Sequence, residues 1–196
     1  MGRQGRKGCR RRRQGGAMLI EVLVAILLCA FALLGYAALQ SRASTAEFEA
    51  LQRSQALVLV EDMANRVNAN RVSAGAYVQS GLLGIGSEQS CSGLGGAALD
   101  LCEWGNLLRG VSESSAGAAI GAMLGARGCI TRAAGSTDRY VITVAWQGVV
   151  STGGAAAPCG HSDTAFPDDT RRRAVSATVC VARLRDPAVA VATQRC

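Results

Sequence analysis

The sequence predicts an α+β fold in which one long N-terminal helix packs on a small antiparallel β-sheet. Three features predict it: an apolar run from Ala17 to Leu39, a helically spaced apolar pattern that continues to about Asn70, and alternating apolar runs near the C-terminus. At 196 residues the chain has room for one modest globular domain with an accessory helix. We therefore divide it into a basic leader (1–16), a transmembrane helix (17–39), an amphipathic helical continuation (40–70) and a globular head (71–196).

Basic residues are concentrated in the leader. Seven of the 21 Lys and Arg residues lie within the first 13 positions, and the remaining 14 are balanced by 14 Asp and Glu. A basic cluster beside an apolar segment indicates membrane topology, with the cluster on the cytoplasmic side. We therefore expect a cytoplasmic N-terminus, a periplasmic head and no binding of nucleic acid.

The run from Ala17 to Leu39 exceeds the ~20 residues that a helix needs to cross a bilayer. It lacks the small-x-small cleavage site of a secretory signal, so we expect it to remain in the mature protein. Its one charged residue is Glu21. A carboxylate at the end of a lipid-facing helix is either solvated among the lipid headgroups or paired with a positive charge. The composition of the segment does not distinguish these two environments for Glu21.

The segment from Gly15 to Ala25 resembles the signal of type IV prepilins, which has a glycine, a cleavage point and an apolar stretch with Glu at its fifth position. The resemblance implies that a prepilin peptidase cuts after Gly16 and methylates the new N-terminus at Ala17. It also implies that Glu21 pairs with the N-terminal amine of a neighbouring subunit, since an unpaired charge in a filament core would be unfavourable. Repeated head-to-tail contacts of this kind build a helical fibre.

Later segments are similar to the minor pilins called PilV, the type IV pilus modification proteins. They are Leu33-Leu34-Gly35, Ala37-Ala38-Leu39-Gln40, Gln55-Ala56-Leu57, Glu61-Asp62-Met63, Arg66, Ala69-Asn70, Asp100-Leu101-Cys102-Glu103-Trp104 and Val144-Ala145-Trp146-Gln147-Gly148.

The resemblance implies a non-catalytic subunit that acts in pilus assembly or priming, with motility and adhesion downstream. Its partners would be other major and minor pilins, first in the inner membrane and then in the pilus at the cell surface. Two alternatives remain open: a minor pseudopilin of a type II secretion system, which shares the N-terminal signal, and a single-span periplasmic binding module.

The periplasmic part begins with a helix whose apolar residues recur at helical spacing with charges between them, which predicts one apolar face: Leu57, Val60, Ala64 and Val67. Residues 72–128 are rich in Gly, Ala and Ser and predict a long loop that carries a short helix near Leu99–Leu108.

Alternating runs predict strands in the last third of the chain. In the segment 140–147 the even-numbered residues are large and apolar and would share one face: Tyr140, Ile142, Val144 and Trp146. A second run alternates from Val175 to Val181, and Ala188–Thr193 forms an expected third strand. An antiparallel sheet follows, with residues 149–170 as the loop between its first two strands.

Six cysteines lie in the head, without the tight pairs of a zinc site and beside one histidine: Cys91, Cys102, Cys129, Cys159, Cys180 and Cys196. They predict three disulfides in an oxidising compartment, with no metal and no cofactor. Cys91 and Cys102 are close enough in sequence to staple the loop. Cys180 points away from the face of Val175 to Val181, and Cys129, Cys159 and Cys196 are its possible partners.

Three polar segments of the head have a functional and a structural interpretation. His161 stands alone in a polar loop, so we expect an exposed side chain and no catalysis. Asp168 and Asp169 suggest calcium, but they fall short of the roughly six to eight oxygens of such a site, and a capped turn fits them better. Arg171 to Arg173 suggest phosphate contacts, but a solvated flank that protects a sheet edge fits them better.

Overall fold

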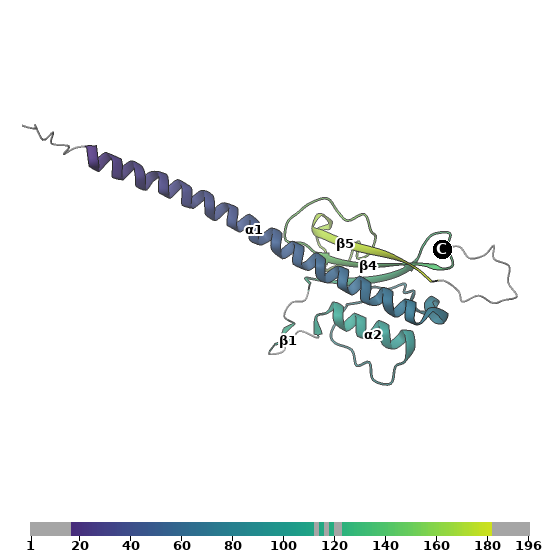
Figure 1. Cartoon of the computed structure of the whole chain (residues 1–196). Helices are drawn as coiled ribbons and strands as arrows, with labels where there is room; N and C mark the ends of the chain where they lie inside the picture. Colours follow the sequence, from purple (N-terminus) through teal and green to yellow (C-terminus); the bar gives the residue numbers. More distant parts are fainter. Residues whose placement is uncertain (1–16, 112–113, 116–117, 120–122, 182–196) are drawn as a thin grey trace, which may run out of the picture. The chain divides into compact units, whose positions relative to one another are not determined.

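The structure is a computed structural model, and it describes residues 17–111, 114–115, 118–119 and 123–181 (Figure 1). The chain divides into two units, Met1–Ala46 and Glu47–Cys196, and helix α1 (Ala17–Ala69) contributes to both. The predicted α+β class is confirmed, because the long helix is followed by a small antiparallel sheet.

The part of α1 in the first unit is apolar and unpacked. Its large side chains are exposed along the whole run, including Leu19, Phe31 and Leu39. Among the described residues, α1 is the one helix long and apolar enough to cross a membrane. This agrees with the composition of the segment from Ala17 to Leu39.

In the second unit α1 buries one face. The buried positions follow each other at intervals of three or four residues: Gln52, Ala56, Val60, Met63 and Val67. Val60 and Val67 were predicted for this face, and Ala64 packs at its margin. The prediction was wrong for Leu57, which is 48% exposed because it lies about 100° around the helix from Ala56.

Helix α1 ends where the sequence predicted, at Ala69. Asn70 leaves the helical region, and a short 3-10 helix η1 (Arg71–Tyr77) follows with a kink at Ser73. A second helix, α2 (Gly96–Leu108), contains the short helix predicted near Leu99–Leu108. The segment between η1 and α2 has no long helix or strand, as expected.

The main sheet has three antiparallel strands in the order β3-β4-β5: β3 (Arg127–Arg132), β4 (Arg139–Gln147) and β5 (Arg172–Cys180). Strands β4 and β5 were predicted. Strand β3 was not, because the interpretation of residues 72–128 as loop ended inside it. The short strands β1 (Ser114–Ser115) and β2 (Ala118–Ala119) form a separate pair. The third strand expected at Ala188–Thr193 lies outside the described residues.

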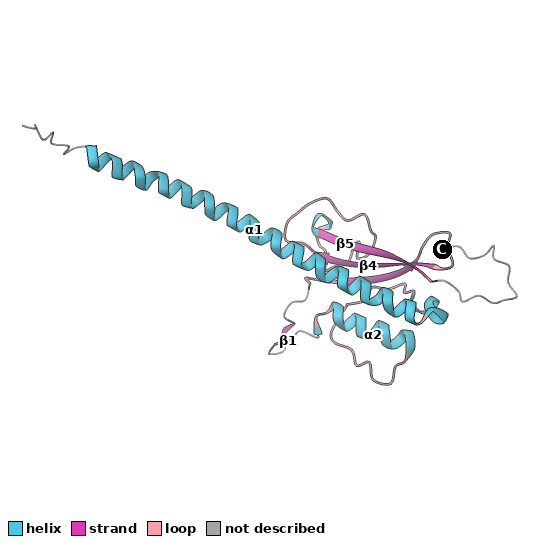
Figure 2. Ribbon diagram, in the orientation of Figure 1, coloured by secondary structure: helices cyan, strands magenta, loops and turns pink. Residues whose placement is uncertain are grey.

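Each face of the main sheet is covered by a different part of the head. On one face the even-numbered residues of β4 and the odd-numbered residues of β5, each set predicted to share a face, meet side chains of α1 and α2 in the main core. Figure 2 distinguishes these helices (cyan) from the strands (magenta). On the other face Ala145 packs with Cys159 and Phe166 of the loop after β4. The loop thus covers part of this second face over β4, while Ser176 and Thr178 of β5 stay exposed on it.

Candidate functional site

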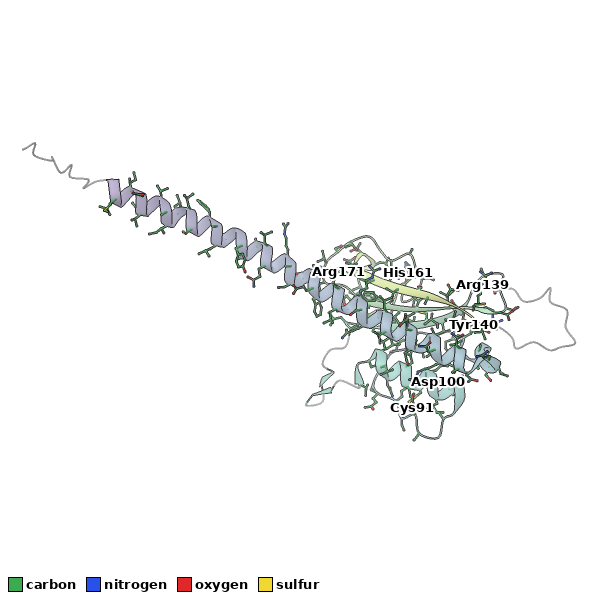
Figure 3. The ribbon with its side chains drawn as sticks, in the orientation of Figure 1. Cys91, Asp100, Arg139, Tyr140, His161 and Arg171 are labelled. Atoms are coloured by element: carbon green, nitrogen blue, oxygen red, sulfur yellow. A yellow bond between two sulfur atoms is a disulfide. The ribbon has the colours of Figure 1, made fainter. Side chains whose placement is uncertain are left out.

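A cluster that we call the clasp joins α1, η1 and α2. It consists of Asp62, Arg66, Tyr77, Asp100 and Glu103. Arg66 Nε donates to Asp62 Oδ2 at 2.9 Å, and Arg66 Nη1 donates to Asp100 Oδ1 at 3.1 Å and Glu103 Oε2 at 2.6 Å. The Tyr77 hydroxyl donates to the second oxygen of Asp100. Helical spacing explains the convergence, since residues three or four apart share a helix face. Asp100 is labelled at this junction in Figure 3.

The clasp changes the pKa values of two of its members. Burial lowers the pKa of Arg66, but its hydrogen bonds and charge interactions with the carboxylates outweigh burial and raise the pKa overall. Burial, together with the hydrogen bond to Asp100, raises the pKa of Tyr77 above its ordinary 10.0. Arg66 is therefore always charged and Tyr77 is a neutral donor at physiological pH. The clasp acts as a fixed joint between helices.

Trp104 adds a second contact between the two helices. Its side chain is fully buried, and its indole Nε1 donates to the Leu59 carbonyl of α1 at 2.8 Å. The ring also lies against β3, where a Cβ built on Gly128 would come within 2.2 Å of the ring carbon Cζ3. Gly128 is thus required for the close approach of α2 to the sheet.

The loop before α2 is held by two side chains of that helix and by its C-cap residue, Arg109. Cys102 forms the disulfide with Cys91 that the short separation suggested. Asn106 accepts from the Gln89 amide and donates to the Gln89 carbonyl, at 3.0 and 2.8 Å. Arg109 donates twice to the Ile85 carbonyl, at 3.0 and 2.8 Å. Burial and the charge of Arg127 lower the pKa of Arg109. These contacts hold the loop at Ile85, Gln89 and Cys91.

Arg172 organises the loop on the opposite face of the sheet. Its side chain is 1% exposed and donates to the carbonyls of Ala155, Ala157 and Cys159, at 2.8, 2.6 and 3.1 Å, and to Asp169 at 2.6 Å. The interpretation of Arg171 to Arg173 as a solvated flank was wrong for Arg172. Residues of a strand alternate between faces, so Arg172 points into the loop while Arg173, the next residue of β5, points to the opposite face. Arg171 precedes the strand.

The arginines on either side of Arg172 also form ion pairs. Arg171 lies 3.7 Å from an Asp168 oxygen, and Arg173 lies 3.5 Å from Glu49 of α1. Each of the three arginines therefore has an acidic partner within 4 Å.

Two further findings concern the cysteines. Cys129 and Cys159 form a disulfide that ties β3 to the loop after β4. Cys180 is also disulfide-bonded. Of the partners expected for it, Cys129 and Cys159 bond each other, and Cys196 lies outside the described residues.

Comparison with known proteins gives one family. A family model described as "Tt1218-like: Type IV pilin Tt1218" matches residues 38–95. The match supports a type IV pilin. Proteins of this kind are structural subunits that associate with other pilins, and the apolar N-terminal helix agrees with membrane anchoring. No curated protein and no solved structure matched the chain.

The matched region contains the part of the chain where helix α1 passes from the first unit into the second. It begins at the end of the apolar run, includes the buried face of α1 and η1, and ends just before α2. Asp62, Arg66 and Tyr77 lie inside it, whereas Asp100 and Glu103 lie just beyond it. In a pilin the clasp would hold the C-terminal half of the long helix against the rest of the head.

The residues of the predicted processing signal fall at the start of α1 where the structure describes them. Gly16 lies outside the described residues, and Ala17 is the first residue of the helix. Glu21 follows one turn later and is exposed, as is the free thiol of Cys29. In the single chain these side chains face outward along with their apolar neighbours, so the cleavage, methylation and pairing roles stay predictions.

The acidic pair and the histidine have ordinary structural environments. Asp168 caps η3 (Asp169–Arg171), because its carboxylate accepts from the Thr170 amide at 3.0 Å. The hydrogen bonds from Thr170 lower the pKa of Asp168, and that from Arg172 lowers the pKa of Asp169. His161 is exposed, with Nδ1 3.0 Å from the Ser162 hydroxyl. Within the described ranges no three His, Cys, Asp or Glu side chains converge as metal ligands.

The sequence analysis did not identify two residues that organise the head, Tyr77 of the clasp and Arg172 of the loop after β4. Tyr77 stands in a segment taken as loop, and nothing in its neighbours indicates the contact with Asp100. Arg172 is hidden in a run of three arginines. The alternation of the following strand could have identified it, because Arg172 lies on the face opposite to Val175, Ala177 and Val179.

Proposed function

We propose that the chain is a minor type IV pilin of the PilV type, a structural subunit that primes or supports pilus assembly. The observation that carries the proposal is the pilin family match over residues 38–95, which begins at the end of the apolar segment of α1, a segment with a prepilin-like start. The clasp supports it further, since two of the PilV-like segments, those at Arg66 and Asp100–Trp104, are the ones that join α1 to α2. Motility and adhesion follow as downstream processes.

In this proposal the basic leader directs insertion into the inner membrane with a cytoplasmic N-terminus. The prepilin peptidase removes residues 1–16 and methylates Ala17. Glu21 lies four residues later, about 6 Å along the helix axis, and pairs with the N-terminal amine of an adjacent pilin. In an apolar filament core a carboxylate without a partner is strongly disfavoured, so each such pair selects the correct axial position of the incoming subunit.

The test is the intact mass of the full chain, recovered from membranes with and without the prepilin peptidase. We expect loss of residues 1–16 and a methylated Ala17 when the peptidase is present, and an intact chain when it is absent. An intact chain in both membranes would exclude a pilin and leave the single-span binding module.

A deletion strain separates the pilus from the secretion alternative. If the proposal holds, loss of the chain reduces surface pili and leaves secretion through a type II system unchanged. Complementation with Glu21→Ala should restore the protein in the membrane but not the pili, whereas Glu47→Ala, an acidic residue further along the same helix, should restore both.

A further inference from the structure

We propose that residues 47–56 of α1, which we call the entry turns, form a hinge that opens locally while the rest of the head stays folded. The first observation is Gln52. It is 2% exposed and is the first residue of the buried face of α1, yet no described residue bonds its amide nitrogen or its amide oxygen. Solvent can bond both atoms when the turn lifts, so this side chain favours the open state.

The entry turns also bury little apolar surface. Their second buried residue is Ala56, which contributes one methyl group, while Phe48 and Leu51 are 44% and 54% exposed. The following turns bury the larger side chains of Val60, Met63 and Val67 at 0 to 1% exposure. They also carry the Trp104 hydrogen bond and the clasp. Local opening is favoured where apolar contacts are few.

Polar contacts of Glu49 hold the entry turns against the loop after β4 and against β5. Glu49 Oε1 accepts from the Val150 amide at 3.1 Å and from Arg173 Nη2 at 3.5 Å. The side chains of Arg173 and Glu49 are 18% and 29% exposed, so water competes for this contact. Val149 and Val150 beside it are 43% and 46% exposed. Breaking one partly exposed ion pair and one hydrogen bond therefore releases the entry turns, and Ala56 is the one residue of the main core that leaves its packing.

The entry turns begin at Glu47, the first residue of the second unit. A hinge there releases residues 47–56 from the sheet side of the head while Val60, Met63 and Val67 stay packed. The inference concerns the head alone and does not depend on the proposed function.

The test measures how fast buried thiols are alkylated in the folded, full-length protein in detergent, with each site resolved by peptide mass spectrometry. Ala56→Cys reports on the entry turns and Val67→Cys reports on the far end of the same face. We expect Cys at position 56 to react at least about tenfold faster than Cys at position 67, because modification requires opening. Equal rates at the two positions would overturn the proposal.

Gln52→Met tests the cause, since methionine keeps the length and the unbranched shape of the side chain and removes its polar atoms. Added to Ala56→Cys, it should slow alkylation at position 56 roughly fivefold or more, and leave position 67 unchanged. Gln55→Met is the matched control, because Gln55 is the same residue type, half-buried and one turn further on. An unchanged or faster rate with Gln52→Met, or equal slowing by both substitutions, would refute the role of Gln52.

Glu49→Gln provides a variant that does not alter the packed face. Loss of the charged contact with Arg173 should speed alkylation at position 56 and leave position 67 unchanged. Acceleration at both positions would mean that the entry turns and the core open together, and that there is no hinge.

Discussion

Arg66 and Glu103 lie 37 residues apart in the sequence and meet across the interface of α1 and α2, with Nη1 2.6 Å from Oε2. The same guanidinium binds Asp100 of α2 and Asp62 of its own helix. Its donors form a rigid planar fork, so one side chain fixes both the distance and the rotation of α2 relative to α1.

Replacing Arg66 by Met should destabilise the head. The change leaves the Asp100 and Glu103 carboxylates near each other without a cation. Their side chains are 23% and 45% exposed, so we expect a loss of about 2 kcal/mol, below the roughly 3–5 kcal/mol of a fully buried pair. Thermal unfolding followed by circular dichroism should show a midpoint about 4–8 °C lower.

Arg53→Met is the control for this experiment. Arg53 is an exposed residue of the same helix, outside the clasp. The control should change the unfolding free energy by less than about 0.5 kcal/mol. Equal midpoints for the two variants would show that the clasp does not stabilise the head.

Two tryptophan substitutions isolate the hydrogen bond between Trp104 and Leu59. Trp104 and Trp146 are both buried in the main core, but within the described residues only the Trp104 indole donates to a carbonyl. Trp104→Phe should therefore cost about 1 kcal/mol more than Trp146→Phe, since both lose similar apolar volume and only one leaves a buried carbonyl short of a donor. Denaturant unfolding of both variants measures the difference, and equal losses would assign the effect of Trp104 to packing alone.

The parts of the fold that were predicted from sequence are those with strong local periodicity. The helix to Ala69 and strands β4 and β5 carry patterns long enough to identify without knowledge of their neighbours. Strand β3 has one fully buried large side chain, Ile130, and therefore lacks an alternating apolar pattern that would identify it. Its extended conformation depends on pairing with β4. Leu57 was assigned to the buried face because it shares helical spacing with the apolar residues Val60 and Ala64, yet it lies outside the buried stripe.

The clasp shows the same limit of sequence reasoning. Arg66 and the segment Asp100–Trp104 were selected by resemblance, but their contact joins residues 34 and 37 positions apart. Such pairs depend on where α2 folds back, and the Gly-rich segment before it gives no periodic signal. The Cys91–Cys102 disulfide could be predicted because the two cysteines are separated by only 11 positions in the sequence, although Cys102 lies in α2 and Cys91 in the loop before it.

Gly128→Ala should disrupt the packing of α2 on β3. The new methyl would lie 2.2 Å from Trp104 and 2.6 Å from Leu108, so the indole or the strand has to move. Overpacking of a core costs roughly 1–3 kcal/mol, and we expect a value at the upper end because the ring is also held by Leu59. Gly153→Ala, where a Cβ meets nothing within 4 Å, is the matched control and should be neutral in the same denaturant titration. Similar losses in both variants would contradict the close approach.

The raised pKa of Tyr77 predicts a specific loss of stability in alkali. A group whose pKa is higher in the folded state than its ordinary 10.0 stabilises the fold fully below pH 10 and loses this contribution as the pH rises through the folded-state value. Ionised Tyr77 would face the Asp100 carboxylate with no proton to share.

Urea unfolding between about pH 8 and pH 11 measures this loss. The free energy of unfolding of the wild type should fall over this range, and it should fall less steeply in Tyr77→Phe, which lacks the titrating hydroxyl. The variant should start from a lower free energy of unfolding near pH 8, because the hydrogen bond to Asp100 is lost. Parallel curves across the range would mean that the hydroxyl of Tyr77 does not couple to folding.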